Sequence, residues 1–321
     1  MKLLCYQNGT SHRCAVLITD QGDTLKVIDL VEAAAAEAPG AAPSGPWLAL
    51  SHARDLVDLA VAPADALETL SAFLRAESSR TLIRRIHRSR LLAPISYPRR
   101  TVFCIGRNYL EHVREGDLKR GIQTPIPQHP QYFIKPPSTV IGGQGAIEIE
   151  PWVSDKIDYK VELAVIIGQP IRNADPESAM AAIFGYTIVN DVTARDLQRQ
   201  HDQWFKGKGL NTFCPVGPSV VTQDEITDPH ALAIRLWVNS DLRQSDITAH
   251  MHFSVGRIIA DLSQGMTLMP GDVIATGTPP GVGYAMTPPQ FLEARDRVVC
   301  EIEGIGRLSN PIRLRPDAQL R

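Results

Sequence analysis

The chain has 321 residues, of which 44% are hydrophobic and 21% are charged, and its formal net charge is −2. This length suits one large domain or two ordinary ones, and the composition is that of a globular protein with a substantial core. The nearly balanced charge argues against a protein that binds nucleic acid electrostatically.

The cysteines and the apolar segments indicate the compartment. The five cysteines form no C-x-x-C and no Cys/His pair at zinc spacing, so a reducing compartment is expected. The N-terminal "MKLLCYQNGT" turns polar within a few residues, and no apolar run reaches the ~18–20 residues of a membrane span. We therefore expect a cytoplasmic protein that binds neither nucleic acid nor membrane.

The first hundred residues predict a small α/β unit. Residues 13–30 predict a hairpin around "DQGD", and residues 64–77 carry leucines at helical spacing. The basic run at 80–90 is interpreted as the solvated face of a helix. Two prolines in "LLAPISYPRR" suggest a boundary. We expect a small N-terminal α/β domain over 1–96 and a catalytic domain over 97–321.

The rest of the chain is rich in strands and poor in long helices. Strand patterns occur at 101–106, 161–168, 183–191, 232–239, 272–278 and 297–306. Helices are plausible at 107–115, 175–182, 193–200 and 252–263. This order predicts an α+β or mostly-β body and not a βαβ repeat. A Walker lysine and a G-x-G-x-x-G turn are both absent from the sequence.

The segment "IDYKVELAVIIG" (157–168) is unusual for a strand. At a period of two, its odd-numbered positions are apolar. The even-numbered positions begin with Asp158, Lys160 and Glu162, so a cation stands between two acids. We expect a strand that runs from a polar pocket into the core.

Two further segments pair groups suited to acid–base and anion chemistry. In "GRNYLEHVRE", His112 and Glu115 would be i, i+3 neighbours on a helix, where the carboxylate orients the imidazole as a general base. A surface ion pair is the alternative. Asp191 ends a strand, and Arg195 follows one helical turn later, where it could clamp a carboxylate. An N-cap with its ion-pair partner is the alternative there.

Two glycine-rich segments add candidate ligands. Lys206 and Lys208 stand among glycines in "WFKGKGLNTFCPVGP", where a lysine could reach a substrate oxyanion. Thr278 and neighbouring N–H groups in "MPGDVIATGTPPGVG" could hold a carboxylate. Ordinary solvated turns are the alternative for both segments.

Taken together, seven ordered blocks resemble the fumarylacetoacetate hydrolase family. They are "FCIGRNYLEHVRE", "FIKPPSTVIGGQGAI", "DYKVELAVIIG", "FGYTIVNDVTARDLQ", "KGKGLNTFCPVGP", "LMPGDVIATGTPPGVG" and "VVCEIEGIGRLSNPI", spanning roughly 100–313. The resemblance implies an α+β, mostly-β fold with a mixed β-roll/sandwich C-terminal domain. It also implies a homodimer and a pocket that holds Mg²⁺, Mn²⁺ or Ca²⁺ with a dioxo-acid.

The resemblance also implies a role for each candidate residue. His112 and Glu115 would activate water on a mobile lid, and Glu162 and Asp191 would bind metal. The substrate contacts would come from Arg107, Arg195, Gln198, Lys208 and Thr278.

The family pattern D-Y-E-x-E-L places a metal-binding glutamate where this chain has Lys160. A protonated lysine cannot ligate Mg²⁺, which takes oxygen ligands. Two glutamates, one aspartate and a divalent ion carry the same net charge as Lys160, Glu162 and Asp191. Our main hypothesis is therefore that the Lys160 ammonium replaces the cation, so that no metal cofactor is needed. A residual two-carboxylate metal site, a covalent role for Lys160 and loss of catalysis remain open.

We expect an enzyme that acts on a small dioxo-acid, such as an acylpyruvate, by hydrolytic C–C cleavage. In that reaction Lys160 and Lys208 would stabilise the departing enolate. The first alternative is a metal-independent isomerase or tautomerase, decarboxylase or other lyase-type reaction, because an ammonium cannot chelate two oxygens. The second alternative is a non-catalytic binding homologue, against which the intact set of His112, Glu115 and Lys208 argues.

Overall fold

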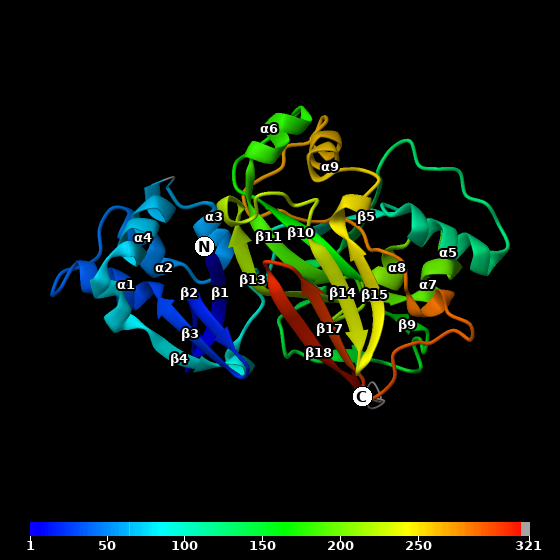
Figure 1. The fold of residues 1–321 in the computed structure, drawn as a ribbon, viewed down its shortest axis with the longest axis horizontal. Helices are drawn as coiled ribbons and strands as arrows, with labels where there is room; N and C mark the ends of the chain where they lie inside the picture. The colour runs from blue at the N-terminus through cyan, green and yellow to red at the C-terminus, as the bar shows by residue number, and fades with distance from the viewer. Residues whose placement is uncertain (64, 316–321) are drawn as a thin grey trace, which may run out of the picture.

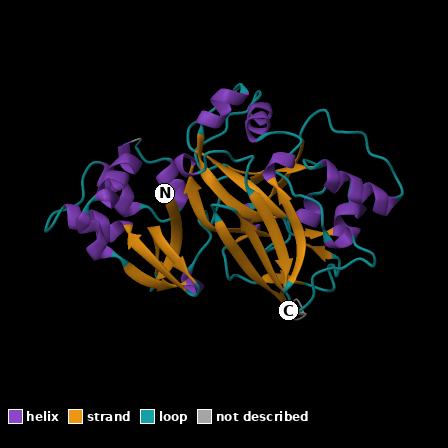
Figure 2. Cartoon of the chain, in the orientation of Figure 1, coloured by secondary structure: helices purple, strands orange, loops and turns teal. Residues whose placement is uncertain are grey.

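The computed structural model describes residues 1–63 and 65–315. It is an α+β structure dominated by strands, as expected from the sequence. An N-terminal lobe of strands and short helices lies beside a larger lobe, whose sheets face each other (Figures 1 and 2). The predicted domain boundary near residue 96 stays a prediction, and the last positions of the predicted catalytic domain lie outside the described residues.

One large mixed sheet passes through both lobes. Its β1 pairs with β13 through Lys2↔Val221 and Leu3↔Val220, so the N-terminal strands extend the sheet of the larger lobe. In spatial order the strands are β4 (Arg84–His87), β3 (Thr24–Asp29), β2 (Ser11–Gln21), β1 (Lys2–Asn8), β13 (Cys214–Thr222), β11 (Ile183–Asn190), β10 (Val161–Ile167), β16 (Val273–Ala275), β5 (Val102–Gly106) and β6 (Gln131–Lys135), with β7 (Val140–Ile141) beside β13.

A smaller sheet packs on one face of the large sheet. It contains β15 (Asp241–Ile247), β14 (Ala233–Val238), β17 (Arg297–Ile302), β18 (Gly306–Leu314) and β8 (Ile147–Ile149), and a separate pair joins β12 (Thr193–Ala194) to β9 (Ile157–Asp158). Leu163 and Val165 of β10 share a core with residues of β14 and β17, whereas Ala164 and Ile166 belong to the core on the other face. The alternation predicted for this strand therefore separates the two cores.

The helices surround the sheets. They are α1 (Leu30–Glu37), α2 (Pro46–His52), α3 (Leu56–Ala60), α4 (Asp65–Arg75), α5 (Leu110–Arg120), α6 (Pro176–Ala181), α7 (Arg195–Gln200), α8 (Phe205–Lys208) and α9 (Val255–Leu262). Short 3₁₀ turns are η1 (Glu77–Leu82), η2 (Arg88–Arg90), η3 (Pro137–Thr139), η4 (Gln223–Glu225), η5 (Thr248–His250) and η6 (Gly283–Ala285). The helix predicted at 64–77 corresponds to α4, and its first position lies outside the described residues. Within the described part of the chain, no helix has the length and apolar character to cross a membrane.

The interpretation of residues 80–90 as a helix face is wrong. This run consists of the end of η1, the edge strand β4 and η2. In β4 only Ile86 is buried, and the basic side chains next to it lie at least partly exposed on an edge strand. Charged residues at such an edge discourage pairing with other chains.

Two predicted elements near the site differ in detail from the structure. The helix predicted from residue 107 begins at Leu110, because Arg107 has a left-handed backbone with φ 59° and the Asn108 side chain bonds to two distant carbonyls. The continuous strand predicted over 157–168 is interrupted at 159–160 between β9 and β10. Asp158 and Glu162 therefore lie on separate elements.

The apolar strands at 161–168 and 272–278 do not require a partner chain. Every residue of β10 and β16 is buried within a single protomer. Their composition therefore gives no physical argument for the expected homodimer.

Candidate active site

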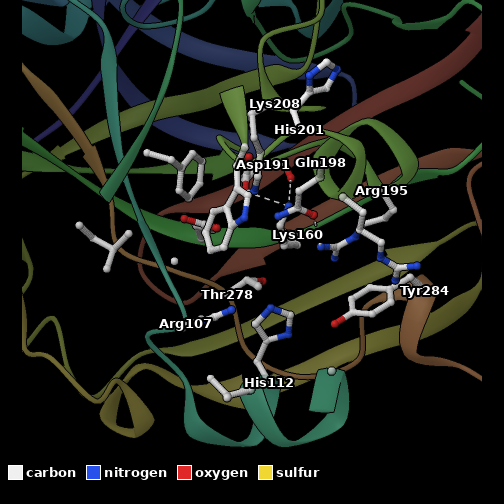
Figure 3. A pocket seen from close by; sticks show the side chains of 18 of the residues that line it. Arg107, His112, Lys160, Asp191, Arg195, Gln198, His201, Lys208, Thr278 and Tyr284 are labelled. Carbon is white, nitrogen blue, oxygen red and sulfur yellow. Dashed lines mark hydrogen bonds and ion pairs between the residues drawn. The ribbon is translucent and has the colours of Figure 1, made fainter. Parts of the chain in front are cut away.

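A cavity of about 380 Å³ opens between α5, the end of β11 and helices α7 and α8 (Figure 3). Nearly all of the predicted site residues line it, although they come from distant parts of the chain. They are Arg107, His112, Lys160, Glu162, Asp191, Arg195, Gln198, Lys208 and Thr278. Glu115 lies behind His112 and contacts it.

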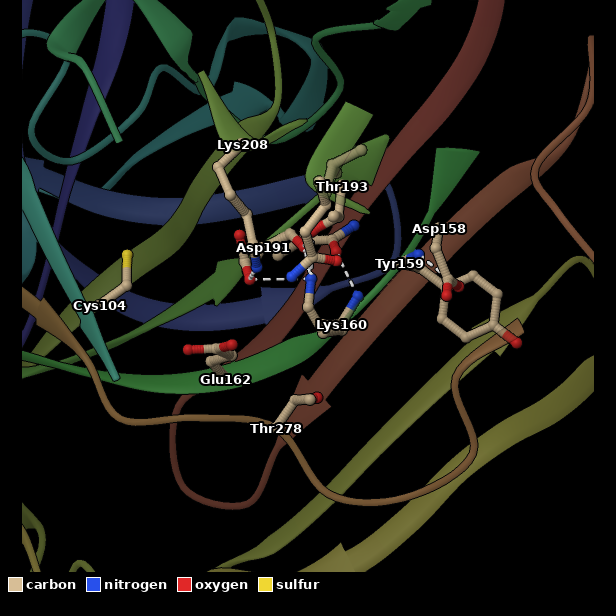
Figure 4. Close-up of polar contacts among 12 residues, drawn as sticks. Cys104, Asp158, Tyr159, Lys160, Glu162, Asp191, Thr193, Lys208 and Thr278 are labelled. Atoms are coloured by element: carbon tan, nitrogen blue, oxygen red, sulfur yellow. Dashed lines mark hydrogen bonds and ion pairs between the residues drawn. The ribbon is translucent and has the colours of Figure 1, made fainter. Parts of the chain in front are cut away.

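The carboxylate of Asp191 is the electrostatic centre of the site. It follows β11 and is fully buried. Its Oδ1 lies 2.9 Å from Lys135 Nζ and its Oδ2 lies 2.8 Å from Lys160 Nζ, while Lys208 Nζ donates to the same Oδ2 (Figure 4). The charges of these lysines hold the pKa of Asp191 well below its usual range, against the effect of burial.

Lys160 points at the end of β11 and the start of β12. Its Nζ donates to the main-chain carbonyl of Asp191 and to Thr193 Oγ1, the latter at 2.5 Å. The Thr193 hydroxyl itself donates to the Asp191 carbonyl at 3.1 Å, which leaves its lone pairs to accept from Lys160. Burial lowers the pKa of Lys160, and the Asp191 carboxylate opposes that shift.

Lys135 is a buried ammonium that the sequence had not marked as a site residue. Its Nζ donates to the carbonyls of Val192 (3.0 Å), Lys208 (2.8 Å) and Phe213 (2.8 Å), in addition to its ion pair with Asp191. It therefore ties the loops that carry Asp191 and Lys208 to the end of β6. We assign it a positioning role.

Lys135→Met is expected to lower the free energy of unfolding by about 3–5 kcal/mol, because it removes one partner of a buried ion pair. Urea denaturation measures this change. Lys206→Met, at an exposed lysine of α8, is the matched control and should change the free energy by less than about 0.5 kcal/mol. Equal effects of the two substitutions would contradict the positioning role.

Glu162 lies apart from the Asp191 cluster on β10. Its Oε2 accepts a hydrogen bond from the Gly277 N–H at 2.9 Å. Burial and the nearby charge of Asp191 raise the pKa of Glu162 to about 8, although the lysines oppose this shift. Glu162 therefore holds its proton more tightly than an ordinary glutamate, next to an aspartate whose charge is balanced by ammonium groups.

His112 and Glu115 form the predicted pair on α5. His112 Nδ1 lies 2.7 Å from Glu115 Oε1, and Glu115 Oε2 accepts from the Gly281 N–H at 2.8 Å. If Nδ1 carries the proton, the Nε2 lone pair is free to act as a base. Burial lowers the pKa of His112 and Glu115 opposes the shift, while the charges of Arg195 and Lys160 lower it further.

Arg195 has one unused nitrogen inside the protein. Its Nε donates to Asp158 Oδ2 at 2.9 Å, its Nη1 donates to Gln198 Oε1 at 3.1 Å, and the guanidinium stacks 4.2 Å from the ring centre of Tyr284. Its Nη2 is buried without a hydrogen-bond partner among the described residues. Because buried donors are rarely left unpaired, this nitrogen is suited to a ligand carboxylate.

The remaining predicted contacts are less direct. The Thr278 hydroxyl donates to the Val161 carbonyl at 2.8 Å and accepts from Gln244 Nε2 at 2.9 Å, so internal bonds already engage it. Arg107 lies over the ring of Trp204 at the cavity wall. Both residues line the cavity, and their roles as substrate contacts stay predictions.

The residues present do not fit a divalent metal ion of the Mg²⁺ or Mn²⁺ type. Such an ion needs several oxygen ligands. Here both oxygens of Asp191 lie at ion-pair distance from ammonium groups, and the other acidic side chains that line the cavity are Glu162 and the exposed Asp202. Across residues 1–63 and 65–315, no group of three His, Cys, Asp or Glu side chains is arranged to hold a metal.

Sequence reasoning assigned no site role to four residues that shape the site. Lys135, Asp158, Thr193 and Tyr284 hold Asp191, Arg195 or Lys160 in place. Lys135 stands in the block "FIKPPSTVIGGQGAI", which was noted only as part of a resemblance. Asp158 was noted as a charged strand position, but its contact with Arg195 depends on the pairing of β9 with β12.

Comparisons with known proteins identify relatives of this chain. Residues 101–313 match the family described as Fumarylacetoacetate (FAA) hydrolase C-terminal. The chain is 43% identical over 263 residues to the oxaloacetate tautomerase YisK of Bacillus subtilis, covering 82% of each chain. It is also 43% identical over 223 residues to the human mitochondrial oxaloacetate tautomerase FAHD2A, covering 69% of this chain and 68% of that protein.

Solved structures share the whole architecture. Fumarylacetoacetate hydrolase from psychrophilic Exiguobacterium antarcticum superposes with a TM-score of 0.76 at 35% identity, covering 98% of this chain and 100% of that one. Maleylpyruvate hydrolase from Sphingobium sp. SYK-6, in complex with manganese(II) and pyruvate, superposes with a TM-score of 0.70 at 29% identity. The match covers 98% of this chain and 99% of that one.

Proposed function

Because the chain belongs to the fumarylacetoacetate hydrolase family, we propose that it interconverts the keto and enol forms of a small 2-oxo dicarboxylic acid of the oxaloacetate type. The observation that carries this proposal is the 43% identity to an oxaloacetate tautomerase over 82% of both chains. The alternative weighed from the sequence, a tautomerase, thus has more support than the main expectation of hydrolytic C–C cleavage.

The site chemistry is suited to the enolate through which such a tautomerisation passes. Lys208 presents a single positive charge to the cavity, which suits one enolate oxygen. The enolate of a 2-oxo acid lies next to its carboxylate in both reactions, and a chelating metal would hold these two oxygens at once. The donors around Asp191 do not fit such a metal.

In the proposed reaction, Arg195 Nη2 holds one carboxylate of the substrate and Lys208 donates to the oxygen on C2. His112 Nε2 removes a proton from C3, which breaks a C–H bond and leaves an enolate whose C2 oxygen accepts a hydrogen bond from Lys208. Lys208 then transfers that proton to the C2 oxygen to give the enol, and the proton held by His112 returns to Lys208 through solvent, which restores both side chains. The reverse sequence forms the ketone. The net change is the shift of one proton from C3 to the C2 oxygen, and no co-reactant is consumed.

The proposal is tested by adding enol-form oxaloacetate and following the loss of its ultraviolet absorbance. The protein should accelerate that loss at least about tenfold over buffer, without forming pyruvate as judged by NMR. Hydrolysis of an acylpyruvate, with release of pyruvate and a carboxylic acid but no effect on the enol, would support the C–C hydrolase instead.

A further inference from the structure

We propose that this site operates with a built-in organic cation in place of a divalent metal ion: the Lys160 ammonium neutralises Asp191 from a metal-ligand position, and the Lys208 ammonium binds the enolate oxygen. The identity of the enolate rests on the proposed function. The pairing of Asp191 with ammonium groups does not rest on the proposed function, and binding measurements can test it without any enzyme activity.

The first support is that ammonium groups already lie beside both oxygens of Asp191. Lys160 and Lys208 pair with Oδ2 (Figure 4). Lys135 Nζ lies 2.9 Å from Oδ1, which accepts no hydrogen bond among the described residues, and all four side chains are buried. A divalent ion at either oxygen would have to lie beside an ammonium in a water-poor site or displace it. Like charges repel strongly there, because the effective dielectric constant is low.

The second support is the number of acceptors around Lys160. Its Nζ contacts Asp191 Oδ2, the Asp191 carbonyl and Thr193 Oγ1, so three acceptors surround one nitrogen. An ammonium has three N–H donors, whereas a neutral amine has two donors and a lone pair. This environment matches the protonated form. It argues against the covalent role for Lys160, which requires a free lone pair.

The third support is that Lys208 keeps donors for a ligand. Its Nζ donates to Asp191 Oδ2 and lies 4.1 Å from the centre of the Phe133 ring, at the wall of the cavity. Among the described residues, Asp191 is its only hydrogen-bond acceptor. The three lysines therefore differ: Lys135 and Lys160 are saturated by protein acceptors, and Lys208 can still donate to a substrate oxygen.

The direct test is a titration with Mn²⁺ followed by the electron paramagnetic resonance signal of the free ion. Wild-type protein should take up no Mn²⁺ at concentrations up to about 1 mM. Lys160→Glu places a third carboxylate beside Asp191 and Glu162 and should tighten Mn²⁺ binding at least about tenfold. Lys156→Glu is the matched control, because it makes the same charge change at an exposed lysine outside the cavity, and it should bind as the wild type does.

One equivalent of Mn²⁺ bound at micromolar concentration by the wild type would overturn the proposal. This measurement stands even if Lys160→Glu fails to fold, which circular dichroism would reveal. A folded Lys160→Glu variant that binds Mn²⁺ no better than Lys156→Glu would also count against a cation position at Lys160.

A second measurement uses oxalate, a stable mimic of an enolate beside a carboxylate. Calorimetry in the presence of EDTA should show that wild-type protein binds oxalate, and Lys208→Met should weaken that binding at least about tenfold. Absence of binding until Mn²⁺ replaces EDTA would overturn the proposal.

The two proposals fail in different ways. Tautomerase activity that EDTA abolishes and Mn²⁺ restores would refute the built-in cation and leave the proposed function intact. If the protein bound oxalate without metal but had no tautomerase activity, the proposed function would be refuted and the built-in cation would be supported.

Discussion

His112→Ala is expected to lower kcat by roughly 10²-fold or more, the usual effect of losing a general base. His112 lies on α5 at the cavity and bonds through Nδ1 to Glu115, so its Nε2 is the proposed proton acceptor. Stopped-flow measurement of enol loss provides kcat. His129→Ala, an exposed histidine in the loop after α5, is the control and should retain wild-type activity.

The pH profile separates a base from a merely structural histidine. Activity should fall as the pH drops through the pKa of His112, which burial places below the ordinary histidine value. Glu115 raises that pKa, so Glu115→Gln should shift the acid limb to lower pH while reducing the maximal rate. An unchanged acid limb together with a normal rate would show that the pair is not the base.

Arg195→Lys is expected to raise KM for the oxo-acid by roughly 10- to 100-fold, which corresponds to losing a charged hydrogen bond of about 1.5–3 kcal/mol. Lysine keeps a positive charge for Asp158 but loses the planar fork and the buried Nη2. Steady-state kinetics measure the effect. The substitution should change KM much more than kcat, because Arg195 holds the substrate carboxylate and does not contact the reacting atoms.

The control for Arg195 is Arg235→Lys, at an exposed arginine of β14 that pairs with Glu301. Its KM should equal that of the wild type. If Arg195→Lys left KM unchanged as well, the unpartnered Nη2 would not be the carboxylate anchor.

Much of the site could be predicted from the sequence because its signals are local. The alternation in 161–167 identified which side chains of β10 face each core, and the i, i+3 spacing identified His112 and Glu115. Local spacing also placed Asp191 at a strand end. Each of these depends on residues a few positions apart.

The contacts that distinguish this site depend on long-range packing. Lys135 reaches Asp191 across 56 positions of the chain and bonds to three loop carbonyls, a role that its flanking residues do not reveal. Asp158 binds Arg195 because the strand breaks at 159–160 and β9 pairs with β12. A strand pattern read at a period of two cannot predict such a break.

A single nucleotide change can exchange Lys160 for the glutamate of the family pattern. Lysine codons (AAA and AAG) become glutamate codons (GAA and GAG) through one nucleotide substitution, so the inferred switch between an organic and an inorganic cation requires a single mutational step. Lys135 would still hold Asp191 Oδ1 after that step, because its three carbonyl contacts do not involve residue 160. A descendant gene could therefore gain or lose dependence on a metal supply without first rebuilding the surrounding scaffold.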